Sequence, residues 1–80
     1  IKMKFEDIDR IIDYIKEFPD KVIIYEIPKD VINVDWKLLE TYSQMVTLVI
    51  ALHDLRLIPK CLEYNLRYYW AYPITSYYEL

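Results

Sequence analysis

The apolar residues of this 80-residue chain recur first at helical and then at strand spacing. Four isoleucines fall at i, i+3, i+4 and i+7 with charged residues between them: Ile8, Ile11, Ile12 and Ile15. This spacing predicts an amphipathic helix of about three turns. Pro19 ends that helix, and the β-branched run at 22–27 then predicts a strand buried on both faces.

The same helix-then-strand order follows a second time. Asp35 can cap a helix whose apolar face includes Leu39 and Tyr42. Residues 46–52 are again rich in Val and Ile, which predicts a second strand. A rival interpretation joins residues 35–58 into one long helix, because several leucines there also fit the helical period.

A third unit begins after His53 and Asp54. Its helix is predicted to turn these residues inward: Leu55, Ile58, Cys61, Leu62 and Leu66. Residues 67–72, dominated by Tyr and Trp, predict the third strand. Ser76 and Glu79 then form a capping box, which predicts a fourth helix and hence a piece of a longer α/β protein.

Strands separated by helical crossovers predict a parallel sheet with right-handed connections. We therefore expect a single α/β domain over residues 1–80, with a three-stranded parallel sheet built from helix–strand repeats. This architecture resembles part of a (βα)n barrel or an open α/β sheet. Three strands cannot close a barrel, so we expect a neighbour to complete the sheet or its edges to be exposed or covered.

Glycine is absent from the sequence. Glycine-rich phosphate loops and the dinucleotide-binding fingerprint depend on that residue, so we expect no cofactor site of either kind. Left-handed helix caps are also predicted to be absent, because glycine is their usual residue.

The charge and cysteine content narrow the functional classes further. Ten bases and thirteen acids give a net charge of −3 without any basic run, which argues against a nucleic-acid partner. Cys61 is the single cysteine, so no internal disulfide can form, and a reducing, cytoplasmic location is expected. The longest apolar run, residues 45–52, is too short to span a bilayer, so no membrane association is predicted.

Ligands of parallel α/β folds bind at the carboxyl ends of the strands. The sequence places Glu26 after the first predicted strand and His53 and Asp54 after the second. These three are the candidate catalytic residues, with His53 as acid/base and Glu26 as its electrostatic partner in hydrolysis or lyase-type proton transfer. Which face Glu26 takes depends on the strand register.

Each candidate also has a structural interpretation. A single histidine at a strand end is commonly a structural residue, Asp54 can cap the third helix, and Glu26 can be a solvated partner of Lys29. No metal site is expected, because transition-metal sites usually recruit several His or Cys ligands at short spacing.

The aromatic residues near the C-terminus suggest a contact surface. Tyr and Trp combine large apolar area with a polar tip, which is typical of protein interfaces. The candidate partner-binding residues are Tyr68, Trp70, Tyr72, Tyr77 and Tyr78. The sequence thus supports two hypotheses: a module that binds a protein partner or itself, and a segment of a larger (βα)-barrel-type enzyme with an incomplete acid/base site.

Overall fold

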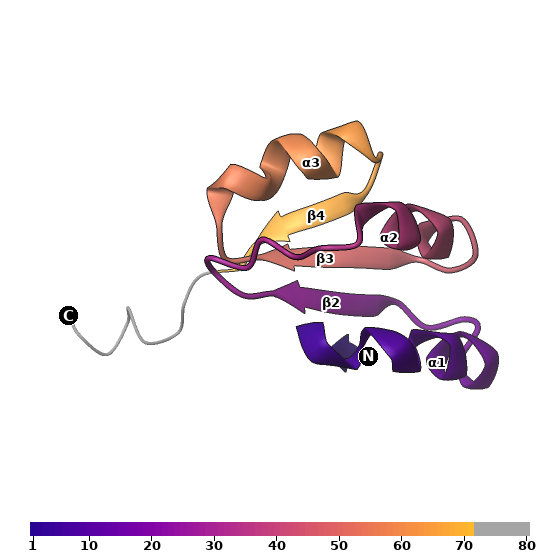
Figure 1. Ribbon diagram of the computed structural model, residues 1–80. Helices are drawn as coiled ribbons and strands as arrows, with labels where there is room; N and C mark the ends of the chain where they lie inside the picture. Colours follow the sequence, from indigo (N-terminus) through magenta and orange to yellow (C-terminus); the bar gives the residue numbers. More distant parts are fainter. Residues whose placement is uncertain (72–80) are drawn as a thin grey trace.

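The computed structural model describes residues 1–71, which form strands alternating with helices (Figure 1). The strands are β1 (Lys2–Met3), β2 (Ile23–Ile27), β3 (Leu48–Leu52) and β4 (Arg67–Trp70). The helices are α1 (Ile11–Glu17), α2 (Trp36–Ser43) and α3 (Ile58–Glu63), with 3-10 segments at Phe5–Arg10 and Leu55–Leu57. The predicted helix at 76–79 lies outside the described residues.

The strands form one all-parallel sheet in the order β1-β2-β3-β4. The predicted α/β class and parallel sheet are therefore confirmed, but the sheet has four strands and not three. The extra strand, β1, is only two residues long and carries no periodic signal. The rival long helix over 35–58 is wrong, because β3 pairs with strands on both sides.

The helices pack against one face of the sheet. Ile11 of α1, Leu39 of α2 and Cys61 of α3 are almost fully buried and belong to one apolar core. The strands contribute alternate residues to that core: Ile23, Tyr25 and Ile27 from β2, and Leu48, Ile50 and Leu52 from β3. This arrangement agrees with right-handed crossovers between neighbouring parallel strands, which place successive helices on the same side.

The opposite face of the sheet, here called the open face, lies outside the core cluster. Strand registers place these residues on it: Lys2, Ile24, Glu26, Val49, Ala51, Arg67 and Tyr69. The burial of β2 alternates strictly, with Ile24 and Glu26 partly exposed. The expectation that this strand is buried on both faces is therefore wrong, and among residues 1–71 no helix of the core covers the open face.

Helix ends use acidic and amide residues where glycine is missing. The Asp35 carboxylate accepts a hydrogen bond of 3.1 Å from the Leu38 N–H and caps α2, as predicted. At the end of α3, Asn65 takes φ = 54°, and the Leu66 N–H bonds to the Cys61 carbonyl at 2.8 Å. The predicted absence of left-handed caps is thus wrong, because asparagine tolerates this conformation.

The inward face of α3 is narrower than its sequence suggests. Cys61 is fully buried and Leu66, just beyond the helix, is nearly so, whereas Leu55 and Leu62 are 58% and 66% exposed. The helix is only six residues long, so few of its positions face the sheet.

Within the described part of the chain, no helix is both long and apolar enough to cross a bilayer.

Candidate functional site

Two of the three candidate catalytic residues meet at the carboxyl edge of the sheet. Glu26 is the penultimate residue of β2, and His53 directly follows β3. Glu26 Oε2 lies 3.9 Å from His53 Nε2, and Glu26 Oε1 lies 3.7 Å from Lys2 Nζ. Glu26 thus contacts Lys2 of β1 as well as His53, and both contacts lie on the open-face side of the strands.

A cavity of about 240 Å³ adjoins this pair. It is lined by Glu26, Pro28, Lys29 and His53. Pro28 and Lys29 lie in the loop that follows β2, and His53 begins the loop that follows β3. The side chains of Glu26 and His53 are 38% and 25% exposed, so both can reach a ligand while remaining partly held by the protein.

Asp54 does not join this pair. Its residue is only 6% exposed, and its carboxylate accepts bonds from Arg56 Nε at 2.9 Å and Arg56 Nη2 at 2.6 Å. It also accepts the Arg56 backbone N–H at the start of the 3-10 segment, which is the capping role considered from the sequence. Hydrogen bonding to Arg56 holds the pKa of the Asp54 carboxyl well below its ordinary value, against the opposing effect of burial.

Asp54 also connects the two loops that line the cavity. Asp30 donates its backbone N–H to Asp54 Oδ2 at 3.3 Å, and its own carboxylate lies 2.6 Å from Arg56 Nη2. Asp30 follows Lys29 in sequence, and Asp54 follows His53. The carboxylate proposed as catalytic from the sequence is therefore placed to position the cavity walls.

The Glu26–His53 pair has the elements of an acid–base site. A carboxylate beside an imidazole can orient the ring for proton transfer to or from a bound ligand. The described residues contain no group of three His, Cys, Asp or Glu side chains that could hold a metal ion.

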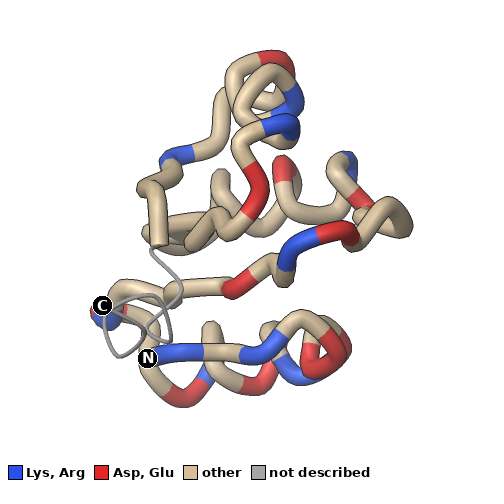
Figure 2. The backbone as a smooth tube through the Cα atoms, turned by 90° about the vertical axis from the view of Figure 1, so that its left-hand side faces the viewer, with Lys and Arg blue, Asp and Glu red and all other residues tan. Residues whose placement is uncertain are grey.

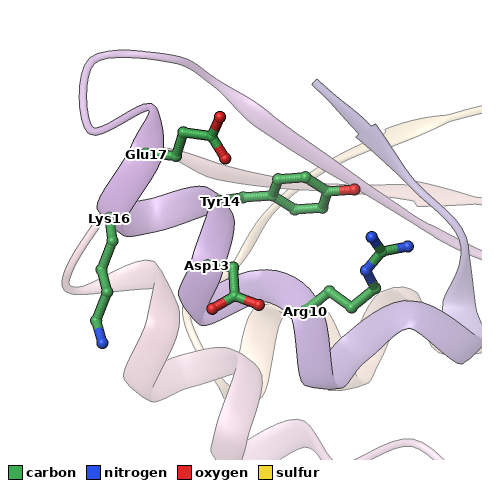
Figure 3. Close-up of a pocket in the computed structure, with 5 residues that line it drawn as sticks. All are labelled: Arg10, Asp13, Tyr14, Lys16 and Glu17. Carbon is green, nitrogen blue, oxygen red and sulfur yellow. The ribbon is translucent and has the colours of Figure 1, made fainter.

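A larger hollow of about 530 Å³ lies elsewhere, along α1. Five residues line it: Arg10, Asp13, Tyr14, Lys16 and Glu17. All come from one short stretch of chain, and Lys16 extends away from Tyr14 (Figure 3). These side chains do not converge from different elements, so the hollow lacks the geometry of a ligand site.

The aromatic candidates fall on different surfaces. Tyr68 and Trp70 are 37% and 38% exposed and pair in register with the core residues Ile50 and Leu52, which places them on the helix-covered side. Tyr69 belongs to the same aromatic cluster but was not among the candidate partner-binding residues; it lies on the open face and is 40% exposed. Tyr72, Tyr77 and Tyr78 lie outside the described residues.

Lys2 and Lys29 are the site residues that sequence reasoning missed. Lys29 follows a strand end, so the positional rule that selected Glu26 and His53 could have included it. Lys2 had no comparable signal, because its strand is too short to detect from a pattern.

Comparison with known protein families, curated proteins and solved structures finds no match to this chain.

Proposed function

We propose that this protein is an α/β interaction module that associates with a second copy of itself through the open face of its sheet. The observation that carries this proposal is the one-sided core: the buried residues of α1, α2 and α3 all belong to the same cluster. Parallel sheets are almost always covered on both faces or closed into a barrel. A face left open in residues 1–71 is therefore a surface that favours a covering layer.

The centre of the open face is apolar. Ile24 and Val49 pair in register and are partly exposed, and Ala51 and Tyr69 pair on the next line of the sheet. Burying apolar area contributes about 25 cal/mol per Å². Ala51 is already fully buried, so contact between two such faces would remove Ile24, Val49 and Tyr69 from water in both copies.

The charges on this face suit a self-complementary contact. Lys2 and Arg67 lie at opposite ends of the line that contains Ile24 and Val49, whereas Glu26 lies one line further along the strands. When two faces stack with their strands antiparallel, Glu26 of each copy can approach Lys2 of the other. A face of a single charge sign would instead repel its own copy.

The area of the open face determines the affinity expected for self-association. Strand spacings of about 4.8 Å and a rise of about 3.3 Å per residue give a footprint of roughly 300 Å² per copy. Stable interfaces bury about 1,200–2,000 Å² in total, so this contact should be weak and concentration-dependent. We expect a dissociation constant on the order of 0.1–1 mM.

Sedimentation velocity at rising protein concentration tests this proposal. The apparent mass should rise above the 9.8 kDa of one chain as the concentration approaches ~1 mM. Ile24→Asp should keep the protein monomeric, because it places a charge at the centre of the contact. Tyr69→Ser is a second variant at a more exposed position of the same face.

Ile32→Asp is the matched control, since Ile32 is 93% exposed and lies away from the sheet. It should associate like the unaltered protein. A chain that stays monomeric at ~1 mM, or an equal loss of association in Ile24→Asp and Ile32→Asp, would contradict the proposal. Circular dichroism should verify that each variant remains folded.

A further inference from the structure

We propose that the cavity at the carboxyl edge of the sheet binds a small organic anion, a carboxylate or phosphate compound, through Lys29 and His53. This inference does not depend on self-association, because it rests on Lys29 and His53 of the two loops; the cavity and the open face share only Glu26 among the lining residues. Its lining residues converge from two separate loops and from the end of β2. That convergence distinguishes it from the larger hollow along α1.

An ammonium group of the cavity lining that is unpaired within residues 1–71 favours an anionic ligand. Glu26 is the one acidic residue in the lining, and its two oxygens already lie near Lys2 and His53 at 3.7 and 3.9 Å. Lys29 lines the cavity and has no ion-pair partner among the described residues. Lys2 offsets the charge of Glu26, and Arg56 pairs with both Asp30 and Asp54. The ammonium group of Lys29 is then the cation of the lining that is left to pair with an anion.

The ammonium group of Lys29, unpaired in the part of the chain that the structure describes, contrasts with the acidic character of the whole chain. The protein carries a net charge of −3, and Figure 2, which looks toward the carboxyl ends of the strands, shows acidic and basic segments interspersed along the backbone. An ammonium group without a carboxylate partner attracts anions locally even in an acidic protein. The imidazole of His53 supplies a further hydrogen-bonding group in the lining.

The cavity walls are held in place before any ligand arrives. Asp30 and Asp54 are the neighbours of Lys29 and His53. The Asp30 backbone N–H donates to the Asp54 carboxylate, and Arg56 pairs with the carboxylates of both residues. Ligand binding therefore requires less loss of conformational entropy than it would if the two loops moved independently. The mostly aliphatic stem of Lys29 and the ring of Pro28 provide apolar walls for the carbon atoms of the ligand.

Nuclear magnetic resonance can test this inference directly, because His53 is the single histidine of the chain. Titration of the protein with inorganic phosphate and, separately, with acetate should move the His53 imidazole signals along a saturable curve. The two arms separate the ligand sources: tighter binding of phosphate indicates a phosphate compound, and tighter binding of acetate a carboxylate. We expect dissociation constants on the order of 1–10 mM for these small probes.

Lys29→Gln should weaken binding at least about fivefold, as expected for loss of a charge-assisted contact. Lys16→Gln, which removes an exposed lysine on α1, is the matched control and should leave binding unchanged. Shifts that do not saturate, or that are equal in both variants and the unaltered protein, would overturn the inference. Both lysines are exposed, so neither variant should disturb the fold.

Discussion

At the scale of single residues, Asp54 controls the acid stability of the strand-end loops. Its pKa is lowered in the folded protein relative to its ordinary value of 3.8. Its contribution is therefore complete above about pH 4 and is lost as the pH falls toward the folded value. Asp54→Asn should lower the denaturant midpoint at neutral pH and flatten the decline of that midpoint as the pH falls below about 4.

Asp35→Asn provides the comparison for this variant. It also removes one carboxylate from a helix cap, but Asp35 is exposed and asparagine caps helices equally well. Its midpoint should stay close to that of the unaltered protein across the same pH range. Equal behaviour of the two variants in chemical unfolding followed by circular dichroism would refute the role assigned to Asp54.

At the scale of elements, the end of α3 depends on one left-handed residue. Asn65→Ala should destabilise the protein by about 1–2 kcal/mol, because a Cβ without a polar side chain is disfavoured at positive φ. Asn65→Gly should be neutral or slightly stabilising at the same position. Thermal unfolding of both variants measures the difference, and equal melting temperatures would contradict this account.

The elements themselves show how far sequence patterns extend. Helical spacing of apolar residues identified α1 and α2, runs of β-branched residues identified β2 and β3, and a Tyr- and Trp-rich run identified β4. The two-residue β1 was missed, since its pairing with β2 is a tertiary contact. The sequence also did not reveal that only one face of β2 is buried, because isoleucine residues lie on both of its faces.

The candidate site was predicted in position but not in detail. The strand-end rule selected Glu26 and His53, and the observed register brings them together on one face. Asp54 was grouped with them because helix capping and catalysis use the same residue type at strand ends. Only its contacts with Arg56 and Asp30 separate the two roles.

At the scale of the whole molecule, Cys61 reports on unfolding. It is fully buried, and burial raises the pKa of its thiol to about 11. Few thiolates therefore exist near pH 8, and none is accessible in the folded state. Alkylation by iodoacetamide should be slow in the native protein and fast in guanidinium chloride, as mass spectrometry can follow.

Rapid alkylation without denaturant would show that α3 separates from the sheet locally. The expected result is instead a rate that tracks the global unfolding transition measured by circular dichroism. Agreement of the two midpoints would show that the helices and the sheet unfold as one cooperative unit.

The order of the strands also bears on how the chain can fold during synthesis. Within residues 1–71, each strand after β1 pairs with the strand that precedes it in sequence, and none inserts between two earlier strands. A chain leaving the ribosome can thus add one helix and one strand at a time to an edge already formed. No completed pairing has to open again for the next segment to find its place.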